Sequence, residues 1–395
     1  MMSVSGGLSQ RVAHLTPSAT LSISATAKAM QAEGLDVCSL SAGEPDFETP
    51  DPIRAAAIRA LEEGKTHYGP AAGIPALRQA VADKLQQENG LPFSREQVMI
   101  SNGGKQTLFN LAMVLLDPGD EVILPVPYWV SYPEIATLAG ATVAFVQTEE
   151  AKGFKLTAEQ LRQALTSRSK LLILNSPANP TGAVYHPQEL AALAEVILSV
   201  PDLYVVCDEI YEKLVYGAAR HVSLGSLSPQ IFERIVLSSG FAKAYAMTGW
   251  RIGYLAGPKS IIDAAINLQS HSTSNVCTFA QYGALEALTN PLSGASIEKM
   301  RQEFSQRRDL MLQGIRTLPG VTCPQPEGAF YVFPNISQTG LASVEFCHRL
   351  LKEHHVAAVP GVAFGADHCI RLSYATDRTT IEKGLQRLYQ FVCSL

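Results

Sequence analysis

The middle of the chain alternates short apolar runs with longer segments whose apolar residues recur at helical spacing. The apolar runs predict strands at 97–101, 121–124, 142–146, 170–175, 203–207, 234–238 and 253–256. The patterns at 106–116 and 189–198 predict helices between them. Strands that alternate with helices indicate a wrapped, largely parallel α/β sheet, and their nearly continuous apolar character indicates a sheet covered on both faces.

The pattern changes after about residue 288. Asn290-Pro291 ends a helical segment that begins near Phe279, and a long charged helical segment follows at 297–318. Short strands are then expected near 330–333 and 369–374. This part of the chain therefore predicts a second domain of the α+β class.

The length of the chain, 395 residues with 47% hydrophobic and 17% charged, is enough for two or three domains and a large core. We divide it into an N-terminal segment at 1–49, a large domain at 50–288 and a small C-terminal domain at 289–395. The N-terminal segment is expected to dock on the small domain or on a partner subunit.

Charge and cysteine content narrow the class of protein. The formal net charge is -5 and the chain has no basic cluster, so we expect no nucleic-acid partner. The seven cysteines form no C-x-x-C pair, which is typical of a reducing compartment. The sequence has no 18-residue apolar run and no secretory signal, so we expect no membrane partner and predict a cytoplasmic location. Pairs such as His354-His355 lack zinc-like spacing, so no metal is expected.

The most informative segment is 239–254, where Lys243 stands among small residues and Arg251 follows eight positions later. A lysine amine can form a Schiff base with a carbonyl, and an arginine can hold a phosphate as a planar fork. The pair suggests pyridoxal 5'-phosphate, with its aldehyde on Lys243 and its phosphate on Arg251. Because a lone lysine is usually a solvated surface charge, this interpretation depends on the residues around it.

Several polar residues follow predicted strands, where open parallel sheets bind ligands. Gly103-Gly104-Lys105 opens a helix whose backbone N–H groups can approach an anion, although such pairs are often ordinary turns. Asn179 stands in a loop stiffened by prolines, which a structural turn would also explain. Asp208 ends a buried strand, and Tyr211 follows closely. A carboxylate opposite a pyridine nitrogen keeps that nitrogen protonated, which makes the ring the electron sink that pyridoxal phosphate chemistry requires.

Two further residues extend the pattern. Trp129 is one of two tryptophans and either stacks on a flat ring or fills a core position. Arg371 is a charge within an apolar strand, so it needs a partner. A substrate carboxylate would suit its bidentate fork.

Together these residues resemble those of the class I aminotransferases of pyridoxal phosphate fold type I, and most closely the bacterial and plastid-type aspartate aminotransferases. The resemblance covers essentially the whole chain, from segment 39–47 to Arg371. The residues that carry it occur in this order along the chain: Asn179, Asp208, Tyr211, Lys243, Arg251 and Arg371. It implies a large domain with a mostly parallel seven-stranded sheet, a smaller α+β domain, bound pyridoxal phosphate and ping-pong transamination.

The resemblance implies a role for each matching residue. Lys243 would hold the cofactor covalently and then shuttle the proton, and Asp208 would pair with the ring nitrogen. Asn179 and Tyr211 would hydrogen-bond the phenolic oxygen of the cofactor. Trp129 would stack on its ring.

The phosphate of the cofactor would lie near Gly103, Gly104, Lys105 and Arg251. Tyr68 resembles the tyrosine that reaches the phosphate of the neighbouring subunit, so the resemblance implies a homodimer with shared active sites. The best-studied aspartate aminotransferases carry serines where this chain has Gly240 and Ala242. Arg251 and backbone groups would therefore contribute more to phosphate binding here.

The resemblance also implies a substrate site, in which Arg371 and Gly43 bind the α-carboxylate beside Trp129 and Asn179. The residues that would bind a second carboxylate of the substrate are Ser18, Thr20 and Lys105. We therefore expect aspartate or glutamate as donors and 2-oxoglutarate or oxaloacetate as acceptors. Because a lysine is a less restrictive point charge than a bidentate arginine, prephenate stays open as a bulkier dicarboxylate substrate.

Two other functions stay open. The first is another pyridoxal phosphate reaction on the same fold, such as a lyase or an aminocyclopropane-type synthase. The second is a transcription regulator that uses an aminotransferase-like module as a sensor. Such a regulator carries an additional N-terminal DNA-binding domain, and the roughly 40 residues before Gly43 are neither long nor basic.

Overall fold

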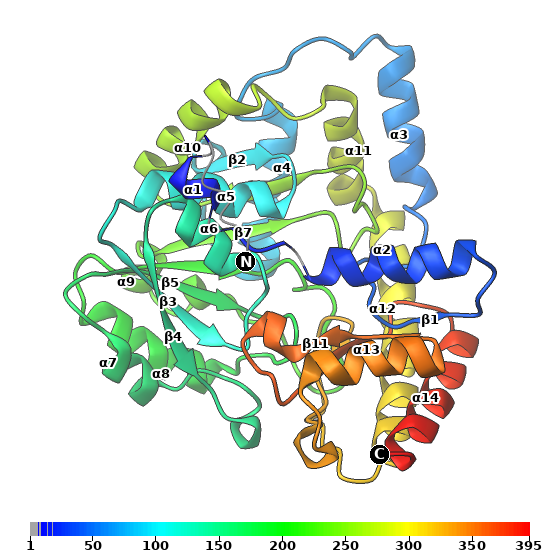
Figure 1. Ribbon diagram of the computed structural model, residues 1–395. Helices are drawn as coiled ribbons and strands as arrows, with labels where there is room; N and C mark the ends of the chain where they lie inside the picture. The colour runs from blue at the N-terminus through cyan, green and yellow to red at the C-terminus, as the bar shows by residue number, and fades with distance from the viewer. Residues whose placement is uncertain (1–6, 8, 14, 18) are drawn as a thin grey trace.

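The centre of the protein is a seven-stranded sheet in the order β2-β8-β7-β6-β5-β3-β4 (Figure 1). The computed structural model describes residues 7, 9–13, 15–17 and 19–395. The strands of this sheet are β2 (Val98–Ser101), β3 (Glu121–Val126), β4 (Thr142–Gln147), β5 (Ser169–Asn175), β6 (Tyr204–Asp208), β7 (Ile235–Gly240) and β8 (Gly253–Ala256). Strand β8 is antiparallel to both of its neighbours, and the other pairs are parallel.

The apolar runs predicted this sheet correctly. Each of the seven predicted strands is present, and its ends lie within two residues of the predicted ends. Gln97, predicted as the first residue of β2, instead ends the short 3-10 helix η1 (Arg95–Gln97). The α/β fold is therefore confirmed.

Helices cover both faces of the sheet, as Figure 1 shows. One face is covered by α5 (Gly104–Leu115), α6 (Tyr132–Leu138) and α10 (Lys259–Ser272). The other is covered by α4 (Pro75–Asn89), α7 (Ala158–Ala164), α8 (Pro187–Leu198), α9 (Pro229–Phe232) and α11 (Thr278–Thr289), with α3 (Asp51–Glu62) packed on α11. In β5, Leu172 and Leu174 enter the core on the second face, while Leu171 and Ile173 enter the core on the first. Successive strand side chains point to opposite faces, so a sheet covered on both sides needs apolar residues at every position.

After α11 the chain forms a smaller α+β unit around its own core. It begins with the long helix α12 (Pro291–Ile315), which starts six residues earlier than predicted. The side chain of Asn290 accepts a hydrogen bond from the N–H of Leu292 at 2.9 Å, and Pro291 occupies the first turn. Both features favour a helix start at this point, so the break between two helices is a single residue.

The smaller unit contains a sheet of order β11-β12-β9, which shares one core with the helices of this unit. Its elements are β9 (Tyr331–Val332), α13 (Ser343–His354), β10 (Val356–Ala357), β11 (Val359–Pro360), β12 (Ile370–Ser373) and α14 (Arg378–Cys393). Strands β9 and β12 lie within the predicted strands at 330–333 and 369–374. Pairing is antiparallel, and Arg371 of β12 stands two positions before Ser373, the strand partner of Tyr331.

The N-terminal segment contributes α1 (Gln10–Ala13), α2 (Ala19–Ala32) and β1 (Cys38–Ser39). Strand β1 pairs in parallel with β10, and α2 packs beside β10 and β11. The segment therefore crosses the C-terminal unit, and its first helix α1 lies beside α6 on the large sheet (Figure 1). The division of the chain at residues 50 and 288 stays a prediction.

In the part of the chain that the structure describes, every helix is too short or too polar to span a bilayer.

Candidate active site

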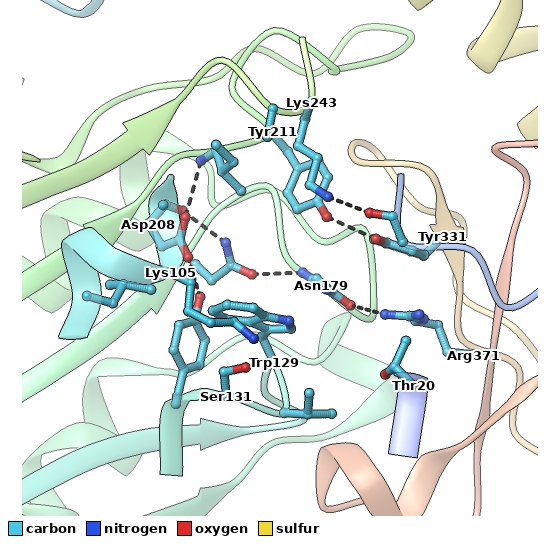
Figure 2. Close-up of a pocket in the computed structure, with 18 of the residues that line it drawn as sticks. Thr20, Lys105, Trp129, Ser131, Asn179, Asp208, Tyr211, Lys243, Tyr331 and Arg371 are labelled. Atoms are coloured by element: carbon cyan, nitrogen blue, oxygen red, sulfur yellow. Dashed lines mark hydrogen bonds between the residues drawn. The ribbon is translucent and has the colours of Figure 1, made fainter. Parts of the chain in front are cut away.

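A cavity of about 340 Å³ opens at the carboxyl ends of β5, β6 and β7. It brings together residues predicted from all parts of the chain: Thr20, Gly43, Gly104, Lys105, Trp129, Asn179, Asp208, Tyr211, Lys243, Arg251 and Arg371 (Figure 2). Its position follows the rule that open parallel sheets bind ligands beyond the carboxyl ends of their strands.

Asp208 is the last residue of β6 and is buried. Its Oδ2 accepts a hydrogen bond from the hydroxyl of Tyr132 at 2.7 Å, and its Oδ1 accepts one from the N–H of Ile210 at 3.3 Å. Burial raises the pKa of Asp208 to about 6, although the two hydrogen bonds oppose the shift. A carboxylate in this position is stabilised by a cationic ligand, because an opposite charge favours the ionised form.

Lys243 follows β7, and its amine donates a hydrogen bond to the carbonyl of Gly43. Desolvation, followed by repulsion from Arg371, lowers the pKa of Lys243 to about 8. An amine with a lowered pKa is neutral in a larger fraction of molecules near pH 7. This fraction can act as a nucleophile and as a base.

Arg371 is 1% exposed, although it carries a charge. Its Nη1 donates to Oδ1 of Asn179 at 2.9 Å, and its Nη2 donates to the carbonyl of Ser41 at 3.1 Å. Within the described residues, the buried Nε of Arg371 has no hydrogen-bond partner. A buried guanidinium with an unused N–H is costly unless an anion reaches it, so this arginine fits a carboxylate ligand.

The loop after β5 is tied to the end of β6. The side chain of Asn175 accepts a hydrogen bond from the N–H of Asn179 at 2.8 Å and donates one to the carbonyl of Asp208 at 2.9 Å. Asn175 therefore fixes the position of Asn179 relative to the carboxylate. Asn175 also lines the cavity, a role that the sequence did not predict although Asn175 begins the proline-containing loop.

The first turn of α5 and Arg251 lie together at the cavity. Gly103 is the N-cap of α5 and packs on Arg251, since a Cβ on Gly103 would lie 2.5 Å from Nη2 of Arg251. Gly103 does not line the cavity, whereas Gly104 does. The N-terminus of a twelve-residue helix beside a guanidinium favours a phosphate.

The glycine at position 240 follows from the packing of two strands. Gly240 of β7 pairs with Gly253 of β8, and a Cβ on Gly240 would lie 2.8 Å from the Cα of Gly253. The strands approach too closely for a serine at this position. The hydroxyl that the best-studied aspartate aminotransferases carry here is therefore sterically excluded.

The side of the cavity formed by α2 and α5 carries Thr20 and Lys105. The buried Oγ1 of Thr20 has no hydrogen-bond partner among the described residues. The amine of Lys105 lies 5.2 Å from the centre of the Trp129 ring, within the range of a cation–π contact. Partial burial and repulsion from Arg251 lower the pKa of Lys105. Ser18, the other predicted hydroxyl, lies outside the described residues.

Tyr68 does not line the cavity of its own chain. Its side chain is 92% exposed. The position is compatible with a contact to a second subunit, which stays a prediction.

Besides Asn175, three polar residues that line the cavity were not predicted: Ser131, Tyr132 and Tyr331. Tyr132 reaches Asp208 across 76 positions of sequence, and Tyr331 reaches Tyr211 across 120. Ser131 precedes α6 near Trp129. Local sequence carries no signal for contacts of this range.

A second polar cluster, partly buried, begins at Glu209, directly after Asp208. Ligand-type atoms of Glu209, Glu212 and His221 lie within 4.8 Å of one another. The amine of Lys84 contacts Glu212, and Asn89 donates to both carboxylates. Lys84 therefore supplies a positive charge to the cluster, which we interpret as a structural ion-pair network.

The cavity fits pyridoxal phosphate. It combines a lysine amine, a buried carboxylate, an aromatic ring and an anion site within the size range of cofactor pockets. Lys243 would hold the aldehyde, Asp208 the ring nitrogen and the turn at Gly104 with Arg251 the phosphate. The unused Nε of Arg371 would remain for the substrate.

The comparisons agree with this geometry. Residues 36–388 match the family model described as aminotransferase class I and II. The chain is 49% identical to an aspartate aminotransferase of Geobacillus stearothermophilus, covering 98% of both chains. It is 48% identical to an aspartate/prephenate aminotransferase of Thermus thermophilus, covering 96% of this chain and 97% of the relative.

A solved structure gives the same result. The aspartate aminotransferase of Thermus thermophilus with maleate superposes with a TM-score of 0.94 and 47% identity, covering 97% of this chain and 99% of that one. The apolar pattern, the cavity and these relatives lead to one conclusion. The chain belongs to the class I and II aminotransferases.

Proposed function

We propose that the protein is a pyridoxal phosphate-dependent transaminase that transfers the amino group of aspartate or glutamate to 2-oxoglutarate or oxaloacetate. The observation that supports it most is the convergence of Lys243, Asp208 and Arg371 on one cavity. Each has an electrostatic state that the reaction needs. These are an amine with a lowered pKa, a buried carboxylate and a buried guanidinium with a free N–H.

Each residue of the cavity has a separate role in one half-reaction. Arg371 and Asn179 orient the α-carboxylate of the amino acid, and Gly43 provides a backbone contact. Lys243 in its neutral form would take the α-proton onto its Nζ and later give that proton back. Pyridoxal phosphate, when bound, supplies the electron sink. Asp208 would hold the ring nitrogen in its protonated form, and Trp129 would stack on the ring.

The preference for acidic substrates rests on Thr20 and Lys105. An unsatisfied buried hydroxyl and an amine on the same side of the cavity suit a second carboxylate. The relatives named above act on aspartate by name, and the Thermus thermophilus structure contains maleate, a dicarboxylate. A lysine does not fix the orientation of a carboxylate as a bidentate arginine does, so prephenate is the second candidate acceptor.

A half-reaction screen tests this function. Purified enzyme loaded with pyridoxal phosphate is mixed with aspartate, glutamate, alanine, phenylalanine and arogenate, and the loss of cofactor absorbance is followed. Aspartate and glutamate are expected to convert the enzyme to the pyridoxamine form without an oxo acid present. Faster conversion by alanine than by aspartate would contradict the acidic preference. Release of pyruvate or ammonia from one amino acid would indicate a lyase.

Lys105→Ala is expected to raise the KM for aspartate about 10-fold, because one charge-assisted hydrogen bond to the second carboxylate is lost. The KM for alanine, which has no second carboxylate, is expected to stay within twofold. Steady-state kinetics with both donors on the same preparation measure the difference. An unchanged KM for aspartate would remove Lys105 from the substrate site.

We also propose a homodimer with shared active sites. Tyr68→Phe is expected to weaken pyridoxal phosphate binding about 10-fold while the dimer mass stays the same, because one hydroxyl donor to the phosphate is removed across the interface. Fluorescence titration of the apoenzyme and sedimentation velocity measure these two quantities. Tyr389→Phe, at a position that is also exposed, is the matched control. A fully active monomer would refute the shared site.

A further inference from the structure

We propose that Tyr331 is a positioning residue that directs the hydroxyl proton of Tyr211 toward the cofactor and links Tyr211 to the carboxylate-binding Arg371. The proposal rests on the proposed function, in which Tyr211 hydrogen-bonds the phenolic oxygen of pyridoxal phosphate. It adds a residue of β9, in the C-terminal unit, to a site built mainly on the large sheet (Figure 2).

The first observation is the pairing of two buried phenols. The hydroxyls of Tyr211 and Tyr331 lie 3.0 Å apart, and the side chains are 3% and 1% exposed. Their rings meet edge to face at 82°, with centroids 5.9 Å apart. In the described part of the chain, each hydroxyl has the other as its hydrogen-bond partner. Both phenols are kept neutral, since burial raises the pKa of each.

The number of available protons fixes which hydroxyl of this pair donates the hydrogen bond to the other. Each hydroxyl carries one proton, so Tyr211 can donate either to Tyr331 or to a ligand, but not fully to both. If Tyr211 donates to the phenolic oxygen of the cofactor, its own oxygen is left to accept the proton of Tyr331. A donated hydrogen bond also polarises the accepting hydroxyl and strengthens its own donation.

The second observation is the stacking of Tyr331 on Arg371. The guanidinium carbon of Arg371 lies 4.3 Å from the centre of the Tyr331 ring and 5.0 Å from that of Phe364. Figure 2 shows Tyr331 between Tyr211 and Arg371. The hydroxyl of Tyr331 therefore faces the cofactor side of the site, and its ring faces the substrate side. Stacking orients the planar fork of Arg371.

These two contacts can be separated by substitution. Tyr331→Phe removes the hydroxyl and keeps the ring, whereas Tyr331→Leu removes both. Tyr331→Phe is expected to raise the pKa of the bound cofactor chromophore by about 0.5 to 1 unit, because the loss of one hydrogen bond weakens donation by Tyr211 to the phenolic oxygen. The dissociation constant of the fastest amino donor is expected to stay within twofold.

Tyr331→Leu is expected to raise the dissociation constant of the same amino donor about 10-fold in addition to shifting the chromophore pKa. Both holoenzymes are titrated by absorbance against pH, and donor binding is measured by single-turnover kinetics. The Tyr211→Phe background is the control, because no hydroxyl remains there for Tyr331 to direct. In that background, Tyr331→Phe is expected to leave the chromophore pKa unchanged.

A chromophore pKa in Tyr331→Phe equal to that of the wild type would overturn the proposal. A shift of the same size in the Tyr211→Phe background would also overturn it, since the effect would then bypass Tyr211. If Tyr331→Leu does not fold, the Phe variants decide alone, because they conserve the ring. A wild-type protein that forms no chromophore with pyridoxal phosphate would instead refute the proposed function.

Discussion

Replacing Lys243 with alanine is expected to lower kcat about 10⁴-fold, the upper range for loss of a group that transfers protons. Lys243 lines the cavity, and its pKa is lowered to about 8, so a useful fraction of its amine is neutral at pH 7 to 8. The buried residues around it cannot replace it. Tyr211 has a pKa raised well above its usual value, and Asp208 is engaged by Tyr132.

The same variant tests the covalent link. Borohydride is expected to fix pyridoxal phosphate to the wild type, with the label on the peptide that contains Lys243, and to leave the variant unlabelled. Equilibrium dialysis is expected to show that the variant still binds the cofactor, since Asp208, Arg251 and the first turn of α5 are unchanged. Lys259→Ala, at an exposed position on α10, is the control for loss of a lysine. Substantial turnover by Lys243→Ala would exclude it as the catalytic base.

The large sheet could be predicted because the apolar pattern that indicates each strand is local in the sequence. The apolar runs of β5 and β6 are continuous, and both cores take residues from each strand. The same locality explains the prediction of Lys243 and Asp208, since Asp208 ends β6 and Lys243 follows the end of β7 by three residues. Residues at the ends of neighbouring parallel strands must meet at one edge of the sheet.

The parts that sequence could not predict depend on the packing of distant elements. Tyr132 is an ordinary aromatic residue at the start of α6 until α6 packs on the sheet and places its hydroxyl at Asp208. Tyr331 belongs to the apolar run at 330–333, which predicts only a short strand, and its place in the site depends on the pairing of β9 with β12. Both residues are indeed in core clusters, and their single polar atoms face the site.

The substitution Asp208→Asn is expected to affect activity and stability in opposite directions. The amide keeps the shape of the side chain but cannot hold a pyridine nitrogen protonated, so kcat is expected to fall about 10²- to 10³-fold. Burial raises the pKa of Asp208 in the folded chain from 3.8 to about 6. A raised pKa means that folding favours the protonated form. The contribution of this carboxyl to the stability of the apoenzyme is therefore complete below pH 3.8 and is lost as the pH rises toward 6.

The apoenzyme of Asp208→Asn is consequently expected to be more stable than the wild-type apoenzyme at pH 8, by up to about 3 kcal/mol of unfolding free energy. The difference is expected to be smaller at pH 5 and to reverse when pyridoxal phosphate is bound, because the ring nitrogen then supplies the cation that Asp208 lacks. Urea denaturation of both apoenzymes and holoenzymes at the two pH values measures all four differences. Asp202→Asn, at an exposed position, is the control and should show none of them. The apoenzyme of the variant could instead be less stable than the wild-type apoenzyme at pH 8. That outcome would mean that the Asp208 carboxylate already has a compensating positive charge within the chain. The assignment of Asp208 to a cationic ring nitrogen would then lose its electrostatic basis.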